Sequence, residues 1–240
     1  MTAFTAQLRA EVTVVRRNGE QLLVTLGIPL LLLGFFSVVD VLPSDTPEAV
    51  DFLVPGILAL AIMSTSMVSL GIATGFERSY LVLKRLAATP LGTPRLIAAK
   101  TLSVAIIEVV QMVLLIGLGV ALGWKAVQPN WLLACIGVLL GTLAFAGIGL
   151  TLAGTLRGEV NLAAVNGLYL VFLLLGGVLF PQDRLPGALQ AVGDLLPTAA
   201  LSEVLRDTLM STGNSTNSWV VLAVWAVAAP AAAAKFFRWS

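Results

Sequence analysis

The sequence has no histidine and a single cysteine, Cys135, among its 240 residues. The absence of histidine excludes catalytic triads built on histidine, most zinc sites and the usual haem ligation. One cysteine cannot form a disulfide within the chain, and the apolar run around it favours a buried, inert thiol.

Charge is also scarce. Only 11% of the residues are charged and 58% are hydrophobic, whereas about a quarter of a soluble domain is charged. The mean hydropathy is +0.97, and we therefore expect an integral membrane protein. The formal net charge of +1 gives no reason to expect a nucleic acid as partner.

Motifs of nucleotide hydrolysis and other catalysis are missing as well. The sequence has no GxxxxGK[ST] phosphate loop and no acidic Walker-B strand, so it cannot hydrolyse ATP by that route. It has no metal-ligand cluster and no Gly-x-Ser-x-Gly nucleophile elbow. We expect no catalytic residue, no metal site and no cofactor in this chain. The first 20 residues, with their charges and no apolar core, do not resemble a secretory signal peptide.

Long uncharged stretches dominate what is present. A membrane-spanning helix needs ~20 apolar residues, because the hydrocarbon layer is ~30 Å thick and each residue rises ~1.5 Å. Six windows qualify: 21–39, 52–76, 101–124, 126–156, 160–182 and 208–234; the third contains one charge, Glu108, and the others contain none. Pro129 marks the start of the fourth span, and the polar loop 212–218 moves the start of the sixth to Trp219. The predicted fold is one all-α membrane domain, 1–240, with six transmembrane helices.

Lysine and arginine divide unequally between alternate loops, eleven on one side and three on the other. Cytoplasmic loops carry the excess of basic residues, so we expect both termini in the cytoplasm. The alanine-rich, lysine-poor composition suggests a high-GC bacterium, and we expect its plasma membrane as the location. The eleven are Arg9, Arg16, Arg17, Arg78, Lys84, Arg85, Arg95, Lys100, Arg157, Lys235 and Arg238, and the three are Lys125, Arg184 and Arg206.

Two further segments contain helices that do not span. Residues 1–19 have apolar side chains at roughly helical spacing, which predicts a helix lying in the cytoplasmic interface. Residues 181–210 are too long for a simple loop. We expect two short helices there, forming a re-entrant or interfacial hairpin at the outer leaflet before the sixth span. An apolar stripe from Leu201 to Leu209 forms one face of the second helix, and Ser202, Glu203, Arg206 and Asp207 form the other.

The basic segment KRLAATPLGTPRLIAAK, 84–100, joins the second and third spans. Pro90 disfavours helix at Thr89, and Thr93 followed by Pro94 is typical of a helix start with Thr93 as the cap. A helix over 77–88, a small tip and the returning third span would form a cytoplasmic hairpin. A plain loop that only fixes topology is one interpretation. Tyr80, Leu81, Leu83 and Leu86, which we expect to be exposed, instead favour a docking partner.

Glycines recur four residues apart at 71 and 75, 119 and 123, and 137 and 141. Such pairs allow membrane helices to approach closely, although glycine is common enough in these helices to produce the spacing by chance.

Glu108 lies about halfway along the third span, where a charge is costly unless it is paired or hydrated. It either lines a transport path or contacts a cationic substrate, or it makes a hydrogen bond between helices, with Gln111 one turn away. Gln111 is a candidate for the same substrate path. Asn161 and Asn166 near the start of the fifth span have the same two interpretations.

Three regions of the sequence resemble the permease subunits of ABC-2 type (type V) ATP-binding cassette exporters, the family that includes daunorubicin-type drug-resistance permeases. They are the basic N-terminal helix, the segment ER…LKRLAATPL…K (77–100), and GGVLFPQDRLPGALQAVGDLLPTAALSEVLRD (176–207). The third is the most specific, because of its FP, LP and LLP spacings followed by ALSEVLR. The match covers nearly the whole chain.

The resemblance implies an efflux system of the multidrug-resistance type, in which one subunit spans the membrane and another hydrolyses ATP. Residues 77–95 would hold a coupling helix that docks on a separate ABC ATPase subunit, and residues 1–19 would form a connecting helix that braces it. Two permeases, identical or related, would assemble with two ATPases in contact with membrane lipid, and ATP and Mg would bind in the partner. The coupling residues would be Glu77, Arg78, Tyr80, Leu83, Lys84, Arg85 and Leu86.

The expected function is ATP-driven export of an amphiphilic drug, lipid or glycan-type substrate by alternating access. Two alternatives stay open. A proton-coupled secondary transporter would depend on Glu108, and a membrane scaffold subunit would transport nothing.

Overall fold

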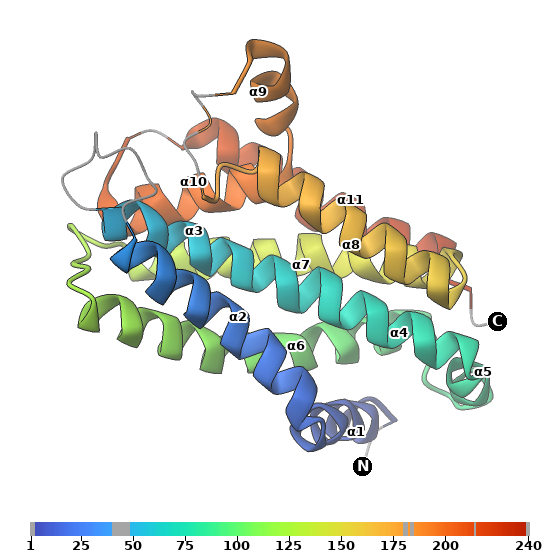
Figure 1. Ribbon diagram of the computed structural model, residues 1–240. Helices are drawn as coiled ribbons and strands as arrows, with labels where there is room; N and C mark the ends of the chain where they lie inside the picture. Colours follow the sequence, from blue (N-terminus) through green and yellow to red (C-terminus); the bar gives the residue numbers. More distant parts are fainter. Residues whose placement is uncertain (1–2, 40–48, 180–181, 183–184, 214, 239–240) are drawn as a thin grey trace.

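The computed structural model describes residues 3–39, 49–179, 182, 185–213 and 215–238. Every element of regular secondary structure in these ranges is a helix (Figure 1). In chain order the helices are α1 (Ala3–Arg17), α2 (Gly19–Val38), α3 (Ala49–Met63), the π-helix η1 (Ser64–Ser69), α4 (Leu70–Ser79), α5 (Val82–Ala87), α6 (Thr93–Ala121), α7 (Trp131–Thr155), α8 (Gly158–Leu175), α9 (Gly187–Gly193), α10 (Pro197–Met210) and α11 (Thr216–Phe236).

Within the described residues, five helices are long and apolar enough to cross a membrane: Val50–Ser79, Thr93–Ala121, Trp131–Thr155, Gly158–Leu175 and Thr216–Phe236. The bent pair α1 and α2 supplies a sixth span if it is taken as one unit. The prediction of an all-α integral membrane protein is confirmed. The sixth span starts three residues earlier than expected, at Thr216.

The second span, formed by α3, η1 and α4, is the centre of the bundle. In its most apolar window 83% of the residues are buried, against 22–50% for the other four spans. Its middle, 53–63, is buried at every position, as expected for a helix that is apolar all round. Helices α2, α6, α7, α8 and α10 pack around it.

Glycines allow the closest helix crossings. A Cβ on Gly71 would lie 3.1 Å from the Cα of Gly149, so α4 and α7 meet almost backbone to backbone. Gly137 and Gly141 receive the side chains of α10. These pairs make contacts within the chain. Gly123 is different, because a Cβ there meets no atom within 4 Å.

Cys135 is exposed on the outside of α7, so the expectation of a buried thiol was wrong. Most residues of 131–140 around it are exposed, because this first part of α7 buries only one side, whereas 141–150 are buried at all but one position.

Two short helices, α9 and α10, precede α11 as predicted, although residues 181 and 183–184 of the predicted hairpin lie outside the described part. The expectation of a polar outer face on α10 was wrong for two residues. Ser202 and Arg206 are both buried. Ser202 donates to the carbonyl of Gly176 at 3.0 Å, and Arg206 donates to that of Gly177 at 2.5 Å. These carbonyls follow the end of α8, where helical partners are lacking.

Candidate functional site at the α5 end of the bundle

The chain turns sharply between α4 and α5. Helix α4 ends at Ser79, and Leu81 has φ 61°, in the left-handed region, before α5 begins at Val82. An uninterrupted helix over 77–88 was therefore wrong, since a non-glycine residue with positive φ breaks the helical path. Thr93 is the first residue of α6 and Gly92 occupies the cap position, one residue before the predicted cap.

The outer surface of this corner exposes apolar and cationic groups side by side. Tyr80 is 72% exposed and Leu81 is 52% exposed. Lys84 and Arg85 on α5 are exposed as well. Exposed apolar side chains gathered in this way are typical of an interaction site.

Leu83 contradicts the expectation of exposure, because it is fully buried. It packs with Leu91, Leu96 and Phe237, while Leu86 and Ala3 pack half-buried against the same cluster. On a helix of six residues, one side chain must face the bundle to hold the helix in place. Leu83 therefore anchors α5 to the start of α6 and to both ends of the chain.

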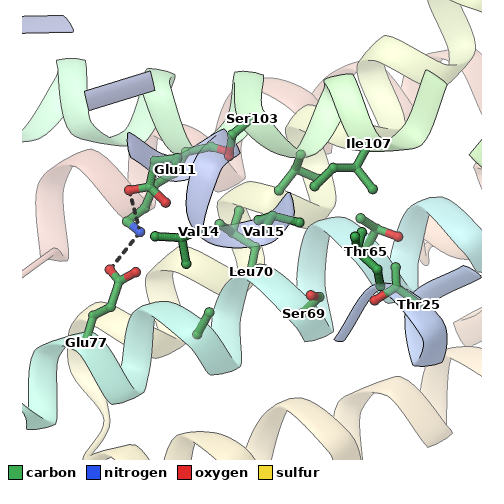
Figure 2. Close-up of a pocket in the computed structure, with 14 residues that line it drawn as sticks. Glu11, Val14, Val15, Thr25, Thr65, Ser69, Leu70, Glu77, Ser103 and Ile107 are labelled. Atoms are coloured by element: carbon green, nitrogen blue, oxygen red, sulfur yellow. Dashed lines mark hydrogen bonds and ion pairs between the residues drawn. The ribbon is translucent and has the colours of Figure 1, made fainter. Parts of the chain in front are cut away.

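A buried ion triad joins three helices beside this anchor. The ammonium of Lys100 on α6 lies 2.9 Å from a carboxylate oxygen of Glu11 on α1 and 2.7 Å from one of Glu77 on α4 (dashed lines in Figure 2). Gln7 donates to the same Glu11 carboxylate at 2.6 Å. Sequence analysis missed this role of Lys100, which it treated only as one more basic residue. Glu77 is a partner inside the bundle and not an exposed docking residue.

The triad closes one end of a cavity between α1, α2, α4 and α6 (Figure 2). Hydroxyl groups of Ser69, Ser103, Thr25 and Thr65 line it among valine, leucine and isoleucine side chains. Polar groups therefore extend from the triad toward the middle of the bundle.

Arg78 is half-buried and donates to the carbonyls of Ala153 and Leu156 at 3.3 and 3.1 Å. These carbonyls belong to the last turn of α7 and its cap, which lack helical partners and attract cations. Arg78 thus holds α4 against the end of α7. This is a structural position, and the side chain is not on the exposed surface of the corner.

Glu108 and Gln111 form a second polar cluster, deep in the bundle. Both are buried. Ser66 on η1 donates to one carboxylate oxygen of Glu108, and Thr142 on α7 donates to the other at 2.5 Å. Gln111 accepts from Thr65 at 2.9 Å and donates to the carbonyl of Thr25 at 2.8 Å. The cluster connects α2, η1, α6 and α7, which is what the inter-helix hydrogen-bond interpretation describes.

The two asparagines on α8 differ. Asn161 is buried and donates to the carbonyl of Gly71 at 2.9 Å, so it holds α8 against α4. Asn166 is exposed and bonds only its own helix, at Leu162. Neither joins the Glu108 cluster in the described structure.

If Glu108 acts as a cross-link, its replacement by glutamine is expected to be mild and by alanine severe. The amide oxygen of glutamine still accepts from one hydroxyl, whereas alanine loses both bonds, at about 1 kcal/mol each. Thermal unfolding in detergent and transport, measured on both variants, check this. Normal stability with lost transport in Glu108→Gln would contradict a purely structural role.

Comparison with known proteins places these features in a family. A family model described as "ABC-2 family transporter protein" matches residues 35–235, from the end of α2 through nearly all of α11. The chain is 27% identical over 203 residues, 82% of each chain, to a Bacillus subtilis (strain 168) protein named "Putative transport permease YvfS". The chain therefore belongs to the ABC-2 family of transporters, as a multi-pass membrane permease.

Proposed function

We propose that the chain is the membrane-spanning subunit of an ATP-driven exporter and that a separate ABC ATPase subunit supplies the energy. Family membership supports a transport role. The lack of a phosphate loop in this sequence supports a division in which another chain binds the nucleotide.

The observation that carries the proposal is the construction of the α4–α5 corner. A coupling element needs an exposed surface for its partner and a stiff connection to the spans. Tyr80, Leu81, Lys84 and Arg85 provide the exposed surface. Leu83 beneath them, and the Lys100 triad beside them, connect the corner to α1, α4 and α6. A displacement of α5 would therefore be transmitted to α1, α4 and α6 together.

The complete exporter would contain two permease copies, identical or related, and two ATPases that bind ATP and Mg. The positive charge gathered on one side supports a bacterial plasma membrane location with both termini in the cytoplasm. Closure of the ATPase dimer would drive alternating access and move an amphiphilic drug, lipid or glycan-type substrate outward.

Charge reversal at the corner tests the proposal. We expect Lys84→Glu with Arg85→Glu to abolish association with the ATPase and ATP-driven efflux, because both side chains are exposed and their loss leaves the bundle intact. The measurement is purification of the tagged chain from its native host in mild detergent. The wild type should retain a partner of ~25–35 kDa with a phosphate loop, and the variant should lose it.

Arg16→Glu with Arg17→Glu is the matched control, since both arginines are exposed on α1 and carry the same charge. It should retain the partner. Wild-type protein that purifies intact without any nucleotide-binding partner would overturn the proposal, and normal efflux by the Lys84 and Arg85 variant would overturn the assignment of the corner.

A further inference from the structure

A groove on the outside of the bundle runs between α6 and α11, with α7 as its floor. We call it the α6–α11 groove. Ala98, Leu102 and Ala105 line it on α6, Pro230 and Ala231 line it on α11, and Leu143 lies on α7. Its surface is almost entirely apolar.

The groove exists because the side chains that α6 and α11 direct toward each other are too small to fill the space between these two helices. α11 packs closely on α7, since Gly147 faces the backbone of Pro230. Helix α6 leans instead on α1, α2 and α3 as well as α7. Alanines on the facing sides of α6 and α11 are too short to close the gap.

Two cations stand at one end of the groove. Arg95 precedes Ala98 by three residues and Lys235 follows Ala231 by four, so each lies on the same side of its helix as a lining residue. Both are exposed. In the part of the chain that the structure describes, neither is within ion-pair distance of a carboxylate, and Arg95 reaches only the carbonyl of Pro90, at 3.4 Å.

The length of the groove fits one leaflet of a bilayer. Its lining on α6 begins at Pro94 and extends to Ala105, and a helix of this length rises ~17 Å. Half of the hydrocarbon layer is ~15 Å thick. Toward the end of the groove away from the two cations lies Thr142, the residue that donates to Glu108.

We propose that the α6–α11 groove binds one acidic phospholipid of the surrounding bilayer, with an acyl chain in the groove and the anionic headgroup on Arg95 and Lys235. The apolar lining suits an acyl chain, and long basic side chains at helix ends reach the headgroup region. The chain would end against Thr142 and so contact the Glu108 cluster. This inference does not depend on the ATPase partner, because it uses only the membrane-embedded surface.

Native mass spectrometry of the full chain in detergent, with phosphatidylglycerol competing against phosphatidylcholine of the same chain length, tests the site. We expect one retained phosphatidylglycerol. Arg95→Gln or Lys235→Gln should weaken its binding about fivefold, and the double variant about thirtyfold. Arg16→Gln with Arg17→Gln, which removes two exposed cations from α1, should leave that one copy in place.

A second pair of variants separates the groove from surface charge. Ala98→Trp fills the groove and should expel the lipid with Arg95 and Lys235 unchanged. Ala163→Trp places the same bulk on an exposed position of α8 and should not. Equal retention of the two phospholipids would overturn the proposal. So would a loss in the Arg16 and Arg17 double variant as large as that in the Arg95 and Lys235 double variant, or lipid retained by Ala98→Trp.

Discussion

Replacement of Lys100 by methionine is expected to destabilise the protein by about 3–5 kcal/mol, because it removes one partner of a buried ionic group and leaves the others uncompensated. Lys100 is 1% exposed and is shared by Glu11 and Glu77. Methionine keeps nearly the same volume, so the loss reports charge and not packing. The same change should release α1 from α4 and α6, and with it the brace of the α4–α5 corner.

Thermal unfolding of the purified chain in mild detergent, followed by circular dichroism, measures this effect. Lys84→Met is the matched control, since Lys84 is exposed, and it should change the midpoint little. A further variant with Glu11→Gln, Glu77→Gln and Lys100→Met should recover much of the loss, because neutral groups leave no uncompensated charge. A midpoint for Lys100→Met equal to that of the wild type would contradict the importance of the triad.

Replacement of Gly149 by leucine is expected to cost about 3 kcal/mol by forcing two helices apart. A Cβ at this position would lie 2.6 Å from the carbonyl oxygen of Met67, and that oxygen belongs to the π-helix backbone and cannot rotate away. Leucine favours helix over glycine by up to about 1 kcal/mol, so the steric cost must exceed this gain.

Gly167→Leu supplies the comparison, because a Cβ at Gly167 meets no atom within 4 Å. It makes the same change within a membrane-spanning helix, and the helix propensity of leucine should leave stability equal or slightly higher. Unfolding midpoints of the two variants in the same detergent decide the matter. A loss for Gly149→Leu no larger than that for Gly167→Leu would show that α7 can shift away from η1 without penalty.

The spans could be predicted because hydropathy is a property of each segment alone. A stretch such as 101–124 has to be a membrane helix whatever it contacts. Which helices meet is not a local property. Glu11 and Glu77 are separated in sequence, and no pattern shows that both face Lys100. The residues predicted for coupling, 77–86, therefore mix exposed side chains with ones that face the bundle.

The same limit explains the errors at Leu83 and α10. The spacing of apolar residues correctly gave one buried face for α10, from Leu201 to Leu209. It could not show that the carbonyls after α8 need donors, which is why Ser202 and Arg206 are turned inward. The guanidinium of Arg206 also lies 3.9 Å from the centre of the Phe52 ring, so aromatic contact compensates part of its burial.

The last turn of α10 is hydrogen-bonded to the segment between α6 and α7, which lies much earlier in the chain. The amides of Val127 and Asn130, between α6 and α7, donate to the carbonyls of Leu209 and Thr208 at 3.0 and 2.8 Å. Synthesis proceeds from the N-terminus. While α7, α8 and α9 are made, these two hydrogen bonds cannot form, because their acceptor residues have not yet been added to the chain. The segment between α6 and α7 therefore reaches its final hydrogen bonding only after residue 209 has been made, just as the Leu83 cluster at the other end of the bundle is complete only after Phe237.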